Sequence, residues 1–184
     1  MIDPAAAKRV KLLVLDVDGV LTDNAIYIGQ VAGERVELKR FDIQDGLGLA
    51  LFQKSGIPVV WMSGRESEAT SLRAAELRIE EVLQIKGAAK LPVMQEMMQR
   101  RGIGWDEIAF VGDDLADLPV MRRCGLPIAV ANAVAEVKNL AVYVTAARGG
   151  EGAVREAIEA LLKARGTWSD SVSGYLNERG DDAA

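Results

Sequence analysis

The segment that decides the fold reads KLLVLDVDGV at residues 11–20. The apolar run at residues 10–15 lacks polar alternation, so it predicts a strand that is buried on both faces. Asp16 and Asp18 follow this run directly. In open α/β sheets, ligands bind beyond the carboxyl ends of the strands, where both carboxylates would lie. The same residues are also typical of a turn that ends a strand, with Gly19 supplying an unusual φ.

Further apolar runs alternate with amphipathic segments along the chain. This order predicts a parallel sheet flanked by helices, with right-handed crossovers. The predicted strands are residues 10–15, 58–62, 82–85, 108–111, 127–130 and 142–144, and the predicted helices are 46–54, 66–77, 88–101, 115–122, 135–140 and 152–164. Residues 1–165 are expected to form one domain. The polar, weakly periodic tail at 166–184 is expected to be mobile on its own.

One segment interrupts this alternation. The β-rich stretches around a glycine-containing turn predict a β-hairpin flap at about residues 25–41. Period-2 spacing places Ile26, Ile28, Val36 and Leu38 on an apolar side of the strands. Because an isolated hairpin is marginal in water, this face is expected to pack against copies from other subunits.

Composition excludes several functional classes. The chain has 184 residues and a net charge of −5, and it lacks the basic stripe of a nucleic-acid binder. It has no apolar run long enough for a signal peptide or a membrane span, so we expect a cytoplasmic protein without a membrane partner. Cys124 is the only cysteine and is expected to be a buried structural thiol. Histidine is absent, which leaves carboxylates, lysines, hydroxyls or a metal for hydrolytic chemistry.

Two further motifs carry groups that suit a phosphate. Ser63-Gly64-Arg65 follows a predicted strand and precedes a helix, where a hydroxyl and backbone N–H groups can cradle an anion. Ser63 is equally suited to be a helix N-cap without a ligand. Lys90 lies near the start of a predicted helix, against the preference of the helix dipole. It is either a cation of the site or a solvated surface lysine.

The fourth motif is acidic and reads GDDLAD at residues 112–117. Carboxylates at the end of a strand suit Mg²⁺, which takes one or two carboxylates together with phosphate oxygens. Asp113 or Asp114 could instead cap the helix that follows. All four motifs fall at the carboxyl ends of strands in one predicted sheet.

The order of the four motifs is characteristic of one superfamily. DxDGV, a serine after a second strand, a lysine and GDDxxD resemble the pattern of the haloacid dehalogenase superfamily, over residues 12–162. The resemblance implies a Rossmann-like α/β fold and phosphate-ester hydrolysis through an aspartyl-phosphate. Asp16 would be the nucleophile, and Asp18 would act as general acid and then as general base. Ser63 and Lys90 would hold the phosphoryl oxygens.

The resemblance also implies a magnesium site. Asp16, the carbonyl of Asp18 and Asp113 would hold Mg²⁺, Asp114 would lie beside them, and Asp117 would orient Lys90 or a metal-bound water. A carboxylate nucleophile is ionised at pH 7 without activation. It still needs the metal and a lysine to relieve its repulsion from a phosphate dianion.

A narrower resemblance covers more of the chain. DVDGVLTD (16–23), FDIQDGLG (41–48), SGR (63–65), VGDDL (111–115) and RGGEGAVRE (148–156) are similar to the 3-deoxy-D-manno-octulosonate 8-phosphate phosphatases. The segments between the motifs are too short for a cap domain. The resemblance therefore implies a capless homotetramer of lipopolysaccharide sugar synthesis, in which a neighbouring subunit covers each site. The tail, with Trp168 and Tyr175 as anchors, could cover a site in the same way.

Arg65, Gly64 and Arg148 are the candidate substrate-binding residues. Octulosonate members carry arginine after Ser-Gly, whereas relatives that act on nine-carbon sialic-type acid phosphates carry an acidic residue. A guanidinium also suits a sugar carboxylate through paired hydrogen bonds. Arg65 could instead form a surface ion pair with Glu66 or Glu68. Arg148 is either presented to substrate by Gly149 and Gly150, or is part of a glycine-rich turn before the last helix.

Other readings stay open at this point. Lys39 and Arg40 are expected to form a solvated charged face rather than to contact substrate, and Asp45 is expected to cap the helix after it. A two-component receiver domain also uses aspartates, Ser/Thr and lysine on a parallel sheet. A non-catalytic regulatory domain could retain the fold without turnover. The second aspartate of the first motif and the late acidic motif favour a phosphatase.

Overall fold

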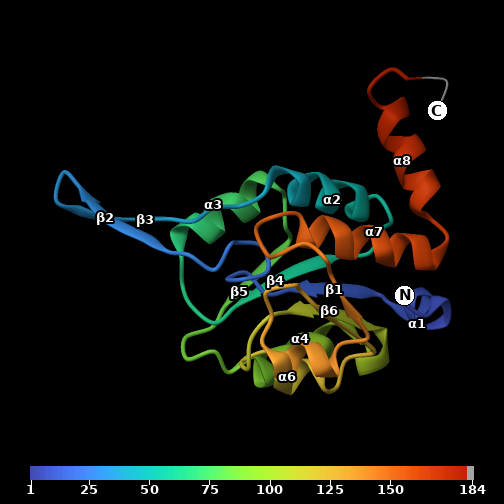
Figure 1. The fold of residues 1–184 in the computed structure, drawn as a ribbon, viewed down its shortest axis with the longest axis horizontal. Coiled ribbons are helices and arrows are strands. Elements are labelled where there is room, and N and C mark those ends of the chain that lie inside the picture. The colour runs from blue at the N-terminus through green and yellow to red at the C-terminus, as the bar shows by residue number, and fades with distance from the viewer. Residues whose placement is uncertain (182–184) are drawn as a thin grey trace.

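The computed structural model describes residues 1–181 and is built around a parallel sheet (Figure 1). Within these residues the sheet has six strands in the order β5-β4-β1-β6-β7-β8. Its strands are β1 (Leu12–Leu15), β4 (Val59–Ser63), β5 (Glu81–Gln84), β6 (Ile108–Gly112), β7 (Leu126–Ala129) and β8 (Tyr143–Val144). β1 lies between β4 and β6, with Leu13 in register with Val59 on one side and Ala109 on the other. The predicted parallel sheet is confirmed.

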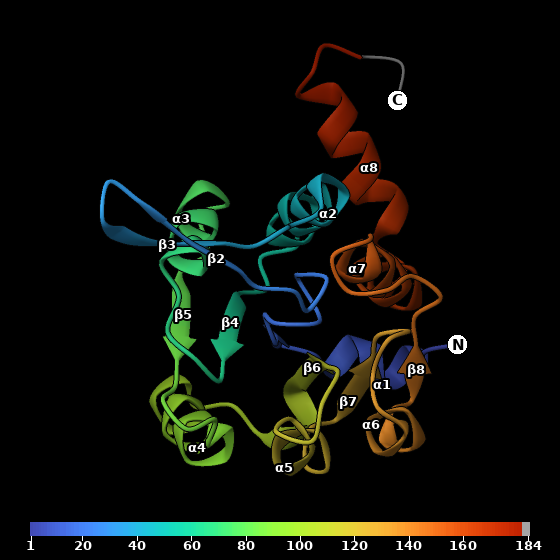
Figure 2. The ribbon, with the colours of Figure 1, turned by 60° about the vertical axis from the view of Figure 1, so that its left-hand side comes forward.

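Helices cover both faces of the sheet. They are α1 (Pro4–Arg9), α2 (Ile43–Gln53), α3 (Glu68–Glu76), α4 (Lys90–Arg101), α5 (Leu118–Met121), α6 (Ala135–Leu140), α7 (Ala153–Arg165) and α8 (Trp168–Asn177). A short 3₁₀ helix, η1 (Trp105–Glu107), precedes β6. Figures 1 and 2 show α2 and α7 above the sheet and α4, α5 and α6 below it. The apolar strands β1, β4, β6 and β7 are therefore buried on both faces.

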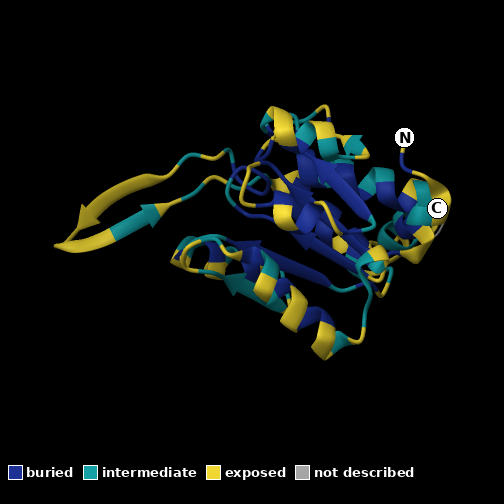
Figure 3. Cartoon of the chain, turned by 90° about the horizontal axis from the view of Figure 1, so that it is seen from below, coloured by how far each residue is buried: buried dark blue, intermediate teal, exposed yellow. Residues whose placement is uncertain are grey.

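A hairpin projects from this body after β1. It consists of β2 (Tyr27–Val31) and β3 (Glu34–Leu38), joined by Ala32 and Gly33. Both linking residues have positive φ, 52° and 86°, as a tight two-residue hairpin turn requires. Every residue of β2 is exposed, and Figure 3 shows the hairpin standing away from the buried core. The described residues between β1 and β4 are thus occupied by the hairpin and α2.

The register of the hairpin corrects its expected apolar face. Residues directly opposite in an antiparallel pair share a face. Ile28 pairs with Glu37, whereas Tyr27 pairs with Leu38 and Gly29 with Val36. Ile28 therefore lies on the face of Glu37, and the prediction that it shares a face with Val36 and Leu38 is wrong. The apolar face comprises Tyr27, Val31, Val36 and Leu38.

Both ends of the chain contain helices that the sequence reading lacked. α1 begins at Pro4 after Asp3, whose carboxylate accepts a hydrogen bond from the N–H of Ala6 (2.8 Å). α8 lies in the tail that was expected to lack structure of its own. The cations of Arg155 and Lys163 on α7 lie over the ring of Trp168, at 5.3 and 5.9 Å from its centre. The last three residues of that tail, 182–184, lie outside the described residues.

Asp45 has a different role from the expected one. Asp42 caps α2, accepting from the N–H of Gln44 at 2.6 Å. Asp45 is buried inside α2 and accepts from the N–H of Arg155 at 2.7 Å, in the first turn of α7. Burial raises the pKa of Asp45 to about 6, although hydrogen bonds from this turn oppose the shift. Asp45 therefore ties α2 to α7 across the face of the sheet.

Among the described residues, no helix combines the length and the apolar character needed to cross a bilayer.

Candidate active site

The loop after β1 is held in a tight conformation that presents Asp16 and Asp18. The N–H of Asp16 donates to the carbonyl of Val111 on β6 (3.0 Å), which continues the sheet. The buried Thr22 hydroxyl accepts from the N–H of Gly19 (3.2 Å). Gly19 has φ of +94°, and a Cβ there would lie 2.0 Å from Asp113 Oδ2. The position therefore requires glycine both for its backbone and for the approach of Asp113.

A second loop packs against the first. Asn132 donates to the carbonyl of Gly19 (2.9 Å) and accepts from the N–H of Gly149 (2.6 Å). A Cβ on Gly149 would lie 1.9 Å from the carbonyl oxygen of Gly19. The N–H of Gly150 donates to the carbonyl of Val20 (3.2 Å). The two glycines thus brace the loop that carries Asp16 and Asp18, and Arg148 beside them is exposed.

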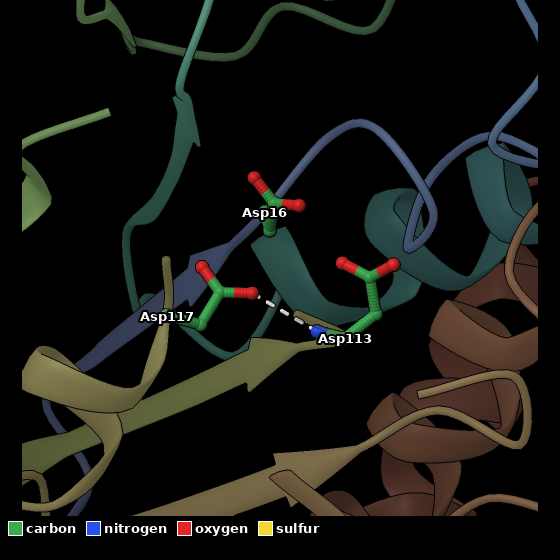
Figure 4. Close-up of side chains that lie close together, drawn as sticks. All are labelled: Asp16, Asp113 and Asp117. Carbon is green, nitrogen blue, oxygen red and sulfur yellow. Dashed lines mark hydrogen bonds between the residues drawn. The ribbon is translucent and has the colours of Figure 1, made fainter. Parts of the chain in front are cut away.

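Three carboxylates meet where β1 and β6 end. Asp16, Asp113 and Asp117 are buried, and one oxygen of each lies within 4.8 Å of the others (Figure 4). The N–H of Asp113 donates to Asp117 Oδ2 at 3.0 Å. Burial, followed by repulsion within the cluster, raises the pKa of Asp16 to about 7 and that of Asp113 to about 8.

The cluster fits a divalent cation. Asp113 Oδ1 is buried and lacks a hydrogen-bond partner among the described residues. Carboxylates whose pKa values are raised by crowding regain their ionised state when a cation is placed between them. Hard oxygen ligands of this kind suit Mg²⁺. Asp114 is exposed next to Asp113, and its carboxylate accepts from the N–H of Leu115 at 2.7 Å.

Lys90, the first residue of α4, lies inside the site. Its side chain is buried, and its ammonium contacts Asp16 Oδ1 and Asp117 Oδ1, the latter at 2.7 Å. Burial alone would lower the pKa of Lys90, but the two carboxylates outweigh it, so the net shift is upward. Asp117 therefore orients Lys90 toward Asp16, and the reading of Lys90 as a solvated lysine is wrong.

Ser63, at the end of β4, also faces the loop after β1. Its hydroxyl lies within donating distance of two acceptors, Asp18 Oδ2 at 3.3 Å and the carbonyl of Arg65 at 3.0 Å. Ser63 is not the N-cap of α3, since Ser67 caps that helix by accepting from the N–H of Thr70 (3.4 Å). The alternative reading of Ser63 as a cap therefore fails.

Arg65 forms an ion pair that was not foreseen. Its two terminal nitrogens donate to the two oxygens of Glu37 on β3, at 2.9 and 2.6 Å. The alternative of a surface ion pair with Glu66 or Glu68 is thus wrong in its partner, which is a residue of the hairpin. Hydrogen bonds from Arg65 hold the pKa of Glu37 at about 2. Glu37 also accepts from the hydroxyl of Ser67 at 2.7 Å.

Lys39 was expected on a solvated face, and this expectation is wrong. Its side chain is fully buried, with Nζ 2.6 Å from Asp18 Oδ1 and 3.1 Å from Thr70 Oγ1. Arg40 does remain half-exposed, near Asp23 and Glu151 at 3.6 and 3.7 Å. A signal for Lys39 was present in the sequence, because Lys39 follows Glu37 by two residues at the end of β3, and this spacing puts both side chains on the same side of an extended chain.

Most of the acidic and basic groups described above line a cavity of about 200 Å³, whereas Ser63 and Lys39 lie outside its lining. Its wall contains Asp16, Asp18, Asn24, Gly64, Arg65, Lys90, Asp113, Asp114, Ala116 and Asp117. The structure thus brings most of the predicted site residues into one cavity. Arg148 lies outside that lining. A larger groove of about 700 Å³ runs beside it, between β3 and α3.

The fold and the acidic cavity point to a hydrolase of the haloacid dehalogenase type. A model described as haloacid dehalogenase-like hydrolase matches residues 81–158. The 3-deoxy-D-manno-octulosonate 8-phosphate phosphatase of Escherichia coli (strain K12) is 42% identical over 162 residues, covering 88% of this chain and 84% of the relative.

Solved structures agree with this similarity. The octulosonate 8-phosphate phosphatase of Moraxella catarrhalis, in complex with magnesium, phosphate and KDO, superposes with a TM-score of 0.88 at 36% identity, covering 94% of this chain and 97% of the other. A cobalt-bound form of the Haemophilus influenzae phosphatase gives a TM-score of 0.83 at 35% identity, covering 93% and 99%. The chain therefore belongs to the family of the 3-deoxy-D-manno-octulosonate 8-phosphate phosphatases.

Proposed function

We propose that this chain is a Mg²⁺-dependent phosphatase that hydrolyses 3-deoxy-D-manno-octulosonate 8-phosphate to the free sugar acid and phosphate. The observation that carries this proposal is the buried Lys90 ammonium between Asp16 and Asp117, at the base of a cavity whose wall includes Arg65. The reaction belongs to lipopolysaccharide sugar synthesis, and we place it in the cytoplasm. Residues 1–165 would form the catalytic domain, and residues 166–184 a tail.

The first chemical step would use Asp16 as the nucleophile. A carboxylate oxygen of Asp16 bonds to phosphorus while the bond from phosphorus to the sugar oxygen breaks. Asp18 gives its proton to the departing sugar oxygen. Lys90 and the hydroxyl of Ser63 neutralise and orient the phosphoryl oxygens.

The second step would regenerate the enzyme. Asp18, now ionised, takes a proton from water, whose oxygen bonds to phosphorus as the acyl-phosphate bond to Asp16 breaks. Asp16, the carbonyl of Asp18 and Asp113 would hold Mg²⁺, with Asp114 nearby. When bound, Mg²⁺ supplies positive charge that keeps Asp16 and Asp113 ionised and lowers the repulsion between Asp16 and phosphate.

Substrate selection would depend on Arg65, on Arg148 and on a hairpin from a neighbouring subunit. In this structure Glu37 occupies both terminal nitrogens of Arg65, so a sugar carboxylate would share or replace that partner. Arg148 is exposed, and it would reach a substrate only from outside the cavity lining. The exposed Tyr27, Val31 and Leu38 support a homotetramer in which a neighbouring hairpin covers the site.

The test is phosphate release from a panel of esters, with and without Mg²⁺. We expect the octulosonate 8-phosphate to be preferred over a nine-carbon sialic-type acid 9-phosphate and over hexose phosphates. Preference for the nine-carbon ester would reassign the substrate. Failure to release phosphate from every ester of the panel, p-nitrophenyl phosphate included, in the presence of Mg²⁺ would identify a non-catalytic regulatory domain.

A further inference from the structure

We propose that Lys39 is a positioning residue that holds the carboxylate of Asp18 in the orientation needed for proton transfer. The inference rests on the proposed phosphatase function, in which Asp18 serves as acid and then as base. It adds a residue of the hairpin segment to the machinery of the same chain.

The first support is the burial of the ion pair. The side chain of Lys39 has no exposed surface, and Asp18 is 21% exposed. Removing an ammonium from water costs several kcal/mol unless a well-placed partner compensates. A lysine on a projecting hairpin would normally keep its ammonium in solvent. The burial of Lys39 against Asp18 therefore indicates a specific contact rather than an incidental one.

The second support is that both oxygens of Asp18 are engaged. Lys39 lies against Oδ1, and the Ser63 hydroxyl lies 3.3 Å from Oδ2, placed to donate to that oxygen or to the carbonyl of Arg65 at 3.0 Å. Asp18 Oδ1 makes no hydrogen bond of good geometry among the described residues, Lys39 included, so the contact with Lys39 is an ion pair that acts through charge. Contacts to both oxygens restrict rotation of the carboxylate about its side-chain bonds.

The third support is that Lys39 is itself anchored. Its ammonium donates to the hydroxyl of Thr70, in the first turn of α3. Two residues earlier on the same strand face, Glu37 binds Arg65 and Ser67. The end of β3 is therefore fixed to α3, and Lys39 extends from this fixed point to Asp18.

Lys90 and Lys39, whose side chains are both buried, contact different aspartates. Lys90 contacts Asp16 and Asp117, whereas Lys39 contacts Asp18. Lys90 thus serves the nucleophile, and Lys39 serves the acid and base. Displacement of a reacting group by about 1 Å costs on the order of 10²-fold in rate, so loss of Lys39 should reduce turnover without abolishing binding.

The first experiment compares Lys39→Met with Lys11→Met. Lys11 forms an exposed ion pair with Glu107 before the amino end of β1, far from the cavity. We expect Lys39→Met to lower kcat on the octulosonate ester by roughly 10²-fold, with KM changed by less than about threefold. Lys11→Met should leave both unchanged. Lys39→Arg, which retains the charge, should recover about tenfold of the loss.

The second experiment separates orientation of Asp18 from a purely structural role. p-Nitrophenolate leaves without a proton, so formation of the aspartyl-phosphate from this ester bypasses Asp18 as acid, but its hydrolysis still needs Asp18 as base. Lys39→Met should therefore release about one p-nitrophenolate per site in a fast burst and then turn over slowly. An equal loss in the burst and in the slow phase would overturn the proposal.

Thr70→Val covers the case in which Lys39→Met fails to fold. It removes the hydroxyl that anchors Lys39 and should lower kcat about three- to tenfold. Unchanged kcat in both Thr70→Val and Lys39→Arg, together with an unfolded Lys39→Met, would show that Lys39 acts on folding alone. An unmodified protein that is inactive on every ester would instead refute the proposed function.

Discussion

At the residue scale, the site is a balance of buried charges. Asp16 and Asp113, whose pKa values are raised, lie close to a third aspartate, Asp117. The buried Lys90 compensates only part of the negative charge of these three residues. This imbalance matches the needs of a site that receives a divalent cation and a phosphate ester together. Replacing any one of these charged groups should therefore have a specific, measurable effect on activity or metal binding.

Asp16→Asn should remove turnover and retain the fold. The amide keeps the shape of the side chain but cannot attack phosphorus, so we expect kcat to fall by at least about 10³-fold. Because the substitution also removes repulsion from the cluster, the melting temperature in EDTA should not decrease. Phosphate release and thermal melting check both parts, and substantial activity in the Mg²⁺-saturated variant would contradict the mechanism.

Asp113→Ala should raise the requirement for magnesium. Removing one ligand of a site with few protein carboxylates should increase the half-saturating Mg²⁺ concentration by tenfold or more, on the order of 1.4 kcal/mol, or abolish activity. Excess EDTA should inactivate the unmodified protein reversibly, and Ca²⁺ should replace Mg²⁺ poorly. Asp106→Ala, an exposed acid remote from the cavity, is the control. Full activity in EDTA would point to another reaction class.

Arg65→Ala should affect substrate choice more than chemistry. Arg65 would contact the sugar acid, whereas Lys90 acts at phosphorus, so the loss should be about tenfold or more on the octulosonate ester and small on p-nitrophenyl phosphate. Measuring kcat/KM for both esters checks this. Equal losses on the two esters would assign Arg65 to the phosphate or to folding.

At the element scale, the hairpin has two faces with different tasks. The face that carries Glu37 and Lys39 is fixed to α3 and to Asp18. The other face presents Tyr27, Val31 and Leu38, all exposed. A monomer would leave this apolar face in water, so we assign it to subunit contact.

If this apolar face makes the proposed subunit contact, charges placed on it should dissociate the proposed oligomer. Tyr27→Glu combined with Val31→Glu should yield smaller species by light scattering, and should lower turnover of the sugar-acid ester several-fold more than that of p-nitrophenyl phosphate. Gln30→Glu introduces charge on the opposite face and is the matched control. An unmodified protein that is monomeric and fully selective would refute the proposed assembly.

At the scale of the whole molecule, the acidic cluster links stability to pH. The folded-state pKa values of Asp16 and Asp113, about 7 and 8, lie above those of an unfolded chain. Between about pH 4 and pH 8 the folded protein thus binds more protons than the unfolded one, and its stability falls as pH rises through this window. In EDTA the melting temperature should drop from pH 5.5 to pH 8.5, and saturating Mg²⁺ should reverse the drop. A melting temperature in EDTA that rises over this range would contradict the raised pKa values of Asp16 and Asp113.

Much of this architecture could be predicted from the sequence. Uninterrupted apolar runs such as Leu12–Leu15 define buried parallel strands, and the aspartates that follow them can be placed at one edge of the sheet. Contacts between distant segments could not be predicted. The hydrogen bond from the N–H of Arg155 on α7 to Asp45 and the pairing of Arg65 with Glu37 depend on how elements pack together, which periodicity does not encode.

The pairing register of the two hairpin strands could not be predicted for a similar reason. The spacing of Ile28, Val36 and Leu38 is compatible with one apolar face on each strand, but the turn at Ala32 and Gly33 fixes which residues are opposite. α8 was missed because its anchors are cation–π contacts of Trp168 with α7, which leave a weak apolar period in the segment itself.

The close approach of Gly149 to Gly19 has a consequence for how the protein is made. The loop that carries Asp16 emerges early from the ribosome, but Asp113 is made much later and the bracing Gly149 later still. Until Gly149 has been made, a nascent chain therefore carries the nucleophile without all of the groups that shape a catalytic pocket around it. Chains that end before Gly149 should be inert toward phosphate esters, and activity should appear only after this glycine has been added and has packed against Gly19.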